Sequence, residues 1–247
     1  MQWKSGSWIQ FAVVLLFLSV LAACSGDNGA AGPTGPQGPA GPPGPPGDPG
    51  PTGNSGVPIG STEKINIEIM SVSVPAGGGA PTVQVRLTND LNQGLTGLPA
   101  GDIRFMLSQL SPAAPGSGGS SEWQSYVTRA SNGVADAQAT TETASAGTFV
   151  DNGDGTYTYT YSQALTAYPA GPTYDENKSH RLGIEIRGQA PISTNGIYDF
   201  IPSLGGPGAG MFTRNIVDND TCNACHDVFD FHGGPRVDIT YCVTCHN

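Results

Sequence analysis

Apolar and polar residues alternate in short runs through residues 61–210, and this pattern predicts β-strands. Successive side chains of a strand point to opposite faces, so an alternating run places its apolar residues on one buried face. The clearest runs lie at residues 65–69, 83–87, 103–107, 157–161 and 182–186, with Gly, Pro and Asn between them. About seven such strands predict a mainly β domain over 61–210, either an antiparallel β-sandwich or a Greek-key barrel.

Local departures from the pattern predict irregular structure. Val72 and Val74 continue the first run in the opposite phase, which predicts a β-bulge near Met70. Met106 is apolar where the alternation of its run calls for a polar residue. Residues 111–121 are rich in Pro, Gly and Ser, so we expect a mobile connection there.

Two polar segments invite a functional interpretation. Asp151-Asn152-Gly153-Asp154-Gly155 offers two carboxylates to Ca²⁺, but a turn explains the same residues without a metal, and we favour the turn. His180 follows the polar stretch Asp175-Glu176-Asn177-Lys178-Ser179, so we expect it in a solvated loop. No Ser-His-Asp catalytic set is indicated.

The amino-terminal segment has the pattern of an export signal. Lys4 precedes an apolar run at 9–20, which is too short to span a bilayer, and Leu21-Ala22-Ala23-Cys24 follows. This sequence resembles the bacterial lipobox, in which the cysteine is lipidated and becomes the first mature residue. We predict a signal peptide at 1–23 and a lipid anchor on Cys24, and Ser25 suggests the outer membrane. The alternative is an ordinary cleavable signal with a chance cysteine.

Glycine occupies every third position from residue 26 to residue 56. This is a collagen-like pattern, because only Gly fits near the axis of three wound polyproline chains. Pro fixes φ in advance, so thirty residues at ~3.1 Å each extend on the order of 90 Å. We predict that residues 24–60 form a stalk that lifts the β domain off the membrane. A homotrimer and a single-chain polyproline stalk are both open at this point.

Charge and cysteine content limit the class of protein. The 247 residues contain 10 Lys and Arg against 20 Asp and Glu, which gives a net charge of −10. Nucleic-acid binders gain affinity by neutralising phosphates with basic residues, so we expect no nucleic-acid partner. The 5 cysteines cannot all pair in disulfides, and Cys24 is one of them.

The other cysteines form two haem-attachment motifs, Cys222-Asn223-Ala224-Cys225-His226 and Cys242-Val243-Thr244-Cys245-His246. In Cys-x-x-Cys-His the two thiols bond to the porphyrin, while the adjacent histidine binds the iron as proximal ligand. The sequence therefore predicts two haem c groups, with His226 and His246 as proximal ligands. The competing interpretation is a four-cysteine zinc site or disulfides. A zinc site needs no His after each cysteine pair, and the compartment to which the chain is exported would oxidise bare thiols. We therefore favour haem.

The ligand on the far side of each iron decides what a haem does. His232, in Phe231-His232-Gly233-Gly234-Pro235-Arg236, is the best distal candidate, with a solvent-exposed loop histidine as the alternative. Six residues from His226 extend up to ~20 Å, so reach alone does not decide which iron His232 binds. The remaining candidates are His180 and Met211 for the other iron, and Arg214 and Arg236 facing propionates.

Residues 61–247 resemble the outer-surface decahaem c-type cytochromes of metal-reducing bacteria, the OmcA/MtrC type. The resemblance rests on the lipobox ending in Cys24, the β domain, Thr221-Cys222-Asn223-Ala224-Cys225-His226, His232-Gly233-Gly234-Pro235-Arg236 and Tyr241-Cys242-Val243-Thr244-Cys245-His246-Asn247. It implies that residues 211–247 begin a loop-rich multihaem domain. It also implies haem attachment at Cys222, Cys225, Cys242 and Cys245, proximal ligands at His226 and His246, and a distal ligand at His232.

The same resemblance implies an electron carrier rather than an enzyme with catalytic side chains. Its partners would be an outer-membrane electron conduit or other multihaem cytochromes, and its acceptors extracellular metal oxides or soluble shuttles. Only two of ten haem motifs are present, so we expect a truncated or fragmentary reading frame. Two rivals are a collagen-stalked surface protein with vestigial haems and haem catalysis at an open iron.

Overall fold

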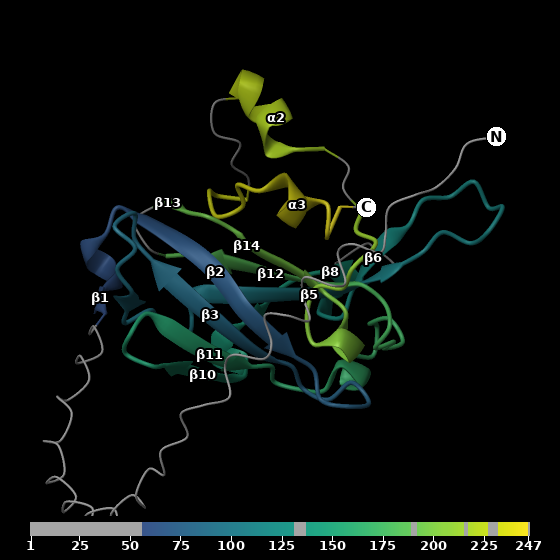
Figure 1. The fold of residues 1–247 in the computed structure, drawn as a ribbon, viewed down its shortest axis with the longest axis horizontal. Helices are drawn as coiled ribbons and strands as arrows, with labels where there is room; N and C mark the ends of the chain where they lie inside the picture. The colour runs from purple at the N-terminus through teal and green to yellow at the C-terminus, as the bar shows by residue number, and fades with distance from the viewer. Residues whose placement is uncertain (1–55, 131–136, 189–191, 215–216, 227–231, 247) are drawn as a thin grey trace, which may run out of the picture. The chain divides into compact units, whose positions relative to one another are not determined.

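The computed structural model describes residues 56–130, 137–188, 192–214, 217–226 and 232–246, without the side chains of Ile192, Ser193 and His226. The predicted signal peptide, the predicted lipidation site Cys24 and residues 25–55 of the predicted stalk lie outside these residues. The described residues all belong to one compact unit that begins at Pro51. Strands dominate this unit (Figure 1).

The longer strands form two sheets. The first has the order β10-β11-β3-β2-β13, and the second has the order β14-β12-β5-β6, with β9 also paired to β5. Neighbouring strands are antiparallel, except that β13 runs parallel to β2. The bounds in the first sheet are β10 Thr148–Asp151, β11 Thr156–Thr160, β3 Thr82–Thr88, β2 Lys64–Ser73 and β13 Ile192–Ser193. Those in the second are β14 Gly196–Phe200, β12 His180–Ile186, β5 Ile103–Ser111, β6 Glu122–Ser125 and β9 Glu142–Thr143.

Shorter elements complete the described fold. β1 pairs in parallel with β4, and β7 pairs antiparallel with β8. The bounds of these strands are β1 Val57–Pro58, β4 Leu95–Thr96, β7 Thr128–Arg129 and β8 Gln138–Ala139. The 3₁₀ helices are η1 Ile59–Ser61, η2 Ala144–Ala146, η3 Leu165–Ala167 and η4 Pro202–Leu204, and the α-helices are α2 Asn219–His226 and α3 Ile239–Cys242.

The core lies between the two sheets. Phe105 of β5 stacks on Tyr159 of β11, with ring centroids 4.2 Å apart and planes inclined by 14°. The apolar residues of the predicted runs supply most of this core, as Ile65, Ile69, Val83, Val85, Leu87, Ile103, Leu107, Tyr157, Tyr161, Leu182, Ile184 and Ile186. The prediction of a mainly β, antiparallel fold is therefore confirmed, and the facing sheets make it a sandwich.

The predicted bulge in the first strand is also confirmed. The register between β2 and β3 shifts between Ile69 and Ser71, and Met70 is 48% exposed.

The carboxylates of the turn at 151–155 accept backbone amides, and one of them, from Gly97, reaches Asp151 Oδ2 at 2.7 Å from outside the turn. Asp151 Oδ1 accepts the amide of Gly153 at 2.8 Å, and Asp154 Oδ1 accepts the amide of Thr156 at 2.8 Å. These bonds are turn chemistry of the kind expected from Asp.

The outer face of the second sheet is covered as well. Every residue of β12 is buried, including the outward-facing Arg181 and Glu185. The cover on this outer face also explains why Met106 is apolar at a position of β5 where the alternation calls for a polar residue. Met106 is fully buried there and contacts Cys245. The residues that cover the sheet belong to the carboxy-terminal segment around α3 (Figure 1).

The prediction of a solvated loop at His180 is wrong. His180 is the first residue of β12, is fully buried and packs among the rings of Tyr126, Tyr174 and Phe200. The polar stretch at 175–179 ends immediately before the strand, so its composition says nothing about the residue that follows. Burial is the main cause that lowers the pKa of His180 to about 4, so the ring is neutral at pH 7.

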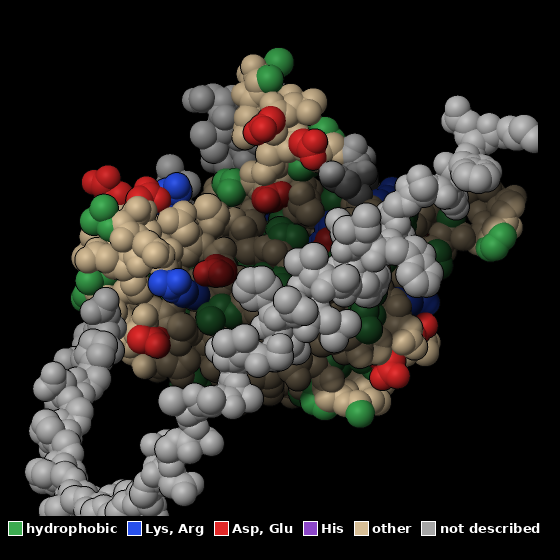
Figure 2. All heavy atoms as spheres, viewed as in Figure 1, with side chains coloured by type: hydrophobic (Ala, Val, Ile, Leu, Met, Phe, Trp, Pro, Cys, Tyr) green, Lys and Arg blue, Asp and Glu red, His purple; other side chains and the backbone are tan. Residues whose placement is uncertain are grey.

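The visible surface carries scattered charges. On the face shown in Figure 2, isolated acidic and basic side chains lie among larger areas of other polar atoms and backbone. Among the described residues, no helix is long and apolar enough to cross a membrane.

Candidate haem-binding site

The first motif lies in helix α2. Cys222 and Cys225 are three positions apart on this helix, so their side chains project from the same side. Cys222 is half-buried and Cys225 is exposed. His226 is the last residue of α2, and its side chain lies outside the described part of the structure.

The second motif begins on α3 and continues as a helical turn. Asp238 caps this helix, because its carboxylate accepts the amide of Thr240 at 2.7 Å. The amides of Cys245 and His246 both donate to the carbonyl of Cys242, at 3.1 and 3.0 Å. The helical turn therefore places the two thiols of this motif on one side, as attachment to a single porphyrin requires.

The outer face of β12 anchors α3. The ring of Tyr241, which is 1% exposed, lies against Gly183 at a place where a Cβ would come within 2.9 Å of it. Arg181 donates from Nη1 to the carbonyl of Thr240 at 3.3 Å. A bidentate ion pair holds Arg181 in place, because its Nε and Nη2 donate to the two carboxylate oxygens of Asp199 at 2.6 and 2.7 Å. The sheet thus holds the second motif through packing and charge together.

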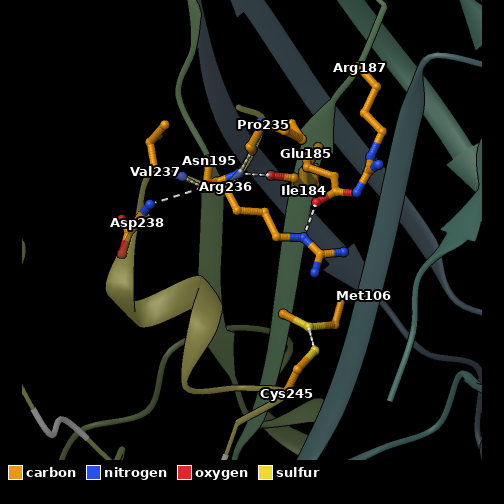
Figure 3. Close-up of polar contacts among 10 residues, drawn as sticks. All are labelled: Met106, Ile184, Glu185, Arg187, Asn195, Pro235, Arg236, Val237, Asp238 and Cys245. Carbon is orange, nitrogen blue, oxygen red and sulfur yellow. Dashed lines mark hydrogen bonds and ion pairs between the residues drawn. The ribbon is translucent and has the colours of Figure 1, made fainter. Parts of the chain in front are cut away.

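Asn195, just before β14, is the centre of a hydrogen-bond network that precedes the second motif (Figure 3). Its Nδ2 donates to the carbonyls of Ile184 and Pro235, at 3.3 and 2.9 Å. Its Oδ1 accepts the amides of Val237 and Asp238, at 2.9 and 3.1 Å. One amide side chain therefore joins β12 to the loop that leads into α3.

A buried carboxylate supplies the second anchor. Glu185 is fully buried and accepts from Nε of Arg187 at 2.8 Å and from Nε of Arg236 at 2.6 Å (Figure 3). Burial alone raises the pKa of Glu185, but the hydrogen bonds and charges of the two arginines outweigh it and lower the pKa overall. Glu185 is therefore ionised and ties the loop around Arg236 to the sheet.

Cys245 points toward the sheet. Its thiol contacts the thioether sulfur of Met106 at 3.1 Å (Figure 3). Burial raises the pKa of the Cys245 thiol to about 11, so the group is protonated at pH 7. The neighbouring Cys242 is half-buried, and burial raises its pKa too.

His232 and His246 come together although fourteen positions separate them in the chain. Their ring centroids are 6.0 Å apart and their planes are inclined by 26°. His232 has a left-handed backbone with φ of 58° and is followed by two glycines that also have positive φ. Desolvation and the charge of Arg236 lower the pKa of His232, which favours the neutral imidazole that binds metals. Both rings line a cavity of about 600 Å³ together with Cys245.

The other distal candidates lie elsewhere. The Nε2 of His180 is 2.9 Å from the hydroxyl of Tyr126, and its Nδ1 is 2.9 Å from the carbonyl of Lys178. Both ring nitrogens are thus engaged in the β domain. Met211, the other distal candidate, is not among the described residues that line the cavity at the second motif. Of the two arginines expected to face propionates, Arg236 lines this cavity and Arg214 does not.

The cysteines do not converge on one point. Among the described residues, no group of three or more His, Cys, Asp and Glu side chains is close enough to hold a metal ion. A zinc site of four thiolates needs all four sulfurs within bonding distance of one ion. The observed arrangement, with a pair of thiols on each helical turn, suits two separate porphyrins instead.

Sequence reasoning missed the part of this site that the β domain contributes. Arg104, Arg129 and Arg187 line the cavity, Met106 contacts Cys245, and Asn195 braces the loop. The one available signal was Met106, whose apolar side chain breaks the alternation of its strand. The arginines gave no signal, because charged residues at polar strand positions, or just after a strand as at Arg187, are ordinary surface residues.

Comparisons with known proteins match this chain to one family. The family described as the decaheme cytochrome c component MtrC/MtrF N-terminal domain matches residues 76–202. The "Multiheme cytochrome MtrC" of Shewanella baltica (strain OS185) is 34% identical over 177 residues, which are 68% of this chain and 25% of that protein. The chain therefore spans about a quarter of the length of this relative.

Two solved structures are similar to this one. The crystal structure of the outer membrane decaheme cytochrome OmcA gives a TM-score of 0.64 at 29% identity, over 77% of this chain and 30% of that one. The crystal structure of MtrC from Shewanella baltica OS185 gives a TM-score of 0.60 at 29% identity, over 74% of this chain and 29% of that one. The predicted resemblance is confirmed: the chain belongs to the MtrC/MtrF N-terminal domain family of decaheme cytochrome c components.

Proposed function

We propose that this chain binds two haem c groups and transfers electrons at the cell surface. Cys222 and Cys225 would attach the first haem, and Cys242 and Cys245 the second. The spacing of each pair on a helical turn and the family of the β domain both support this assignment.

The single observation that supports the proposal best is the approach of His232 to His246. Two imidazoles bound to one metal ion through nitrogens about 2 Å away have ring centroids on the order of 6 Å apart. The distance of 6.0 Å between these rings is of that size. His246 would thus be the proximal ligand of the second haem, and His232 its distal ligand. His226 would be the proximal ligand of the first.

A haem iron takes up and releases one electron, and its axial ligands tune the potential at which it does so. The protein would hold the iron of the second haem between His232 and His246 and the iron of the first haem on His226, with no bond-making chemistry by side chains. The donors would be an outer-membrane electron conduit or other multihaem cytochromes. The acceptors would be metal oxides or soluble shuttles outside the cell.

The attachment to the membrane is part of the proposal. Cys24 would carry the lipid anchor after removal of residues 1–23, and residues 24–55 would form the collagen-like stalk. The expected stalk ends there and not at residue 60, because residues 57–61 form β1 and η1 of the folded unit. The Gly-X-Y period supports an extended stalk, either as a homotrimer or as a single polyproline chain. The same period favours a second candidate function, a stalked surface protein whose haems do not transfer electrons to external acceptors.

The test uses protein produced with its haems in cells competent in cytochrome c maturation. Mass spectrometry should find two haems per chain, and a Cys242→Ala/Cys245→Ala variant should carry one. The reduced protein should be reoxidised by ferric citrate or by an iron oxide suspension. A colourless protein with the mass of the bare chain would exclude haem binding. Two haems that these acceptors fail to reoxidise would favour the second candidate.

A further inference from the structure

Positive charge gathers at one place in this acidic chain. Four of its 10 Lys and Arg residues line the cavity beside the second motif. We call them the arginine cluster, and they are Arg104, Arg129, Arg187 and Arg236. The described lining of the cavity contains no Asp or Glu. In a protein with a net charge of −10, such a cluster needs a physical reason.

Glu185 accounts for only part of this charge. It is fully buried and is not among the described residues that line the cavity. It forms ion pairs with two members of the cluster, Arg187 and Arg236. Each of these pairs through Nε, and a guanidinium has five N–H donors, so this pairing does not exhaust either side chain. One carboxylate against four arginines leaves three positive charges in excess.

Arg104 is the member of the cluster that most needs a partner. It lies on β5 directly opposite Glu185 of β12, so the two side chains share the outer face of the sheet. Among the described residues, its Nε is buried without a hydrogen-bond partner. A buried donor left without a partner costs free energy, so native proteins normally supply one. The missing partner of Arg104 should be an anion.

Arg129 adds a positive charge from a different element. It is exposed on β7, and the described residues place no carboxylate within ion-pair distance of it. The cavity also contains Cys245, His232 and His246, the groups that would hold the second haem. Haem carries two propionates, and arginine is the side chain best suited to bind carboxylates in pairs of hydrogen bonds.

We infer that the arginine cluster binds the propionates of the haem attached at Cys242 and Cys245. This inference rests on the proposed function. It makes the β domain part of the haem site, since Arg104, Arg129 and Arg187 come from its strands and loops. Two propionates would neutralise two of the three excess charges and would give Arg104 its missing acceptor.

The test measures the reduction potentials of both haems in the full-length protein by spectroelectrochemical titration. A positive charge near an iron favours the reduced state, so Arg104→Gln and Arg129→Gln should each lower one of the two potentials and leave the other unchanged. The propionate-bending band in the resonance Raman spectrum should shift in the same variants. Arg129→Lys keeps the charge and should retain the wild-type potential. Arg86→Gln, on β3 of the other sheet, is the matched control and should change neither potential.

Each contrary outcome has a distinct meaning. Wild-type protein without covalent haem would overturn the proposed function and the inference with it. Two haems with unchanged potentials and Raman bands in both variants would overturn the inference alone. Because Arg129 is exposed, its replacement tests the cluster even if Arg104→Gln fails to fold. A potential that responds to the substitutions only in phosphate buffer would assign the cluster to anions from solution, and would also overturn the inference.

Discussion

His232 and His246 lie beside each other in one cavity, with ring centroids 6.0 Å apart and ring planes inclined by 26°. The left-handed backbone of His232 and the two glycines after it turn the chain back toward the second motif. The side chain of Arg236 then fixes this loop to the sheet through Glu185. The β domain thus sets the distance between the two imidazoles.

His232→Ala should open one coordination position on one haem. That haem should change from low-spin to high-spin in its absorption and electron paramagnetic resonance spectra, while the spectra of the other haem should not change. His232→Met should keep the iron six-coordinate and raise its potential, because a Met ligand favours the reduced state. Met70→Leu, at an exposed position of β2, is the control and should leave both haems unchanged. If neither haem changes its spin state in His232→Ala, then His232 is not a distal ligand.

The inner face of the sandwich could be predicted from the sequence because strand alternation is a local property. Val83, Val85 and Leu87 alternate with polar residues and are fully buried in the core, as expected. The bulge at Met70 was visible for the same reason, since one extra residue reverses the phase of the pattern.

The outer face could not be predicted, because its burial depends on a segment distant in the chain. Arg181 and Glu185 occupy polar positions of an alternating strand, and local pattern assigns such residues to solvent. They are buried because residues 235–245 fold back over the sheet, and the guanidinium of Arg181 also lies over the ring of Trp123, 4.4 Å from its centroid. The cavity arises in the same way, as Arg104 and Arg236 are brought together by the fold and not by spacing.

Gly183 leaves the space that the ring of Tyr241 occupies. In Gly183→Ala the new Cβ would lie 2.6 Å from Met106 Cε and 2.9 Å from Tyr241 Cε2, so the ring must move. We expect the free energy of unfolding to fall by about 1–3 kcal/mol in urea titrations. Trypsin should also cleave faster after Arg236, because the loop loses its anchor. Gly101→Ala, which meets nothing within 4 Å, is the matched control. Equal stability of the two variants would show that Tyr241 does not dock as described.

Glu185→Gln removes the charge that holds Arg187 and Arg236. Both arginines would then lack their carboxylate, and breaking a buried pair typically costs about 3 kcal/mol or more. We expect a loss of this size in the free energy of unfolding, measured in urea. Glu68→Gln makes the same chemical change at an exposed position of β2 and should stay within about 0.5 kcal/mol of the wild type. A loss as small as that of the control would mean that the pair contributes little.

His180 should make the protein less stable in weak acid. Its pKa is about 4 in the folded state and 6.5 in an unfolded chain, mainly because burial disfavours the charged ring. Between these values the unfolded chain binds a proton that the folded protein does not. Stability is therefore complete above pH 6.5 and falls as the pH drops toward 4, by on the order of 3 kcal/mol. Urea unfolding of the wild type and of His180→Gln between pH 7.5 and about pH 4 measures this effect. We expect the variant to be less stable than the wild type at pH 7.5, because it loses ring packing, but its stability should depend less on pH. Parallel pH profiles for the two proteins would show that another group causes the acid sensitivity.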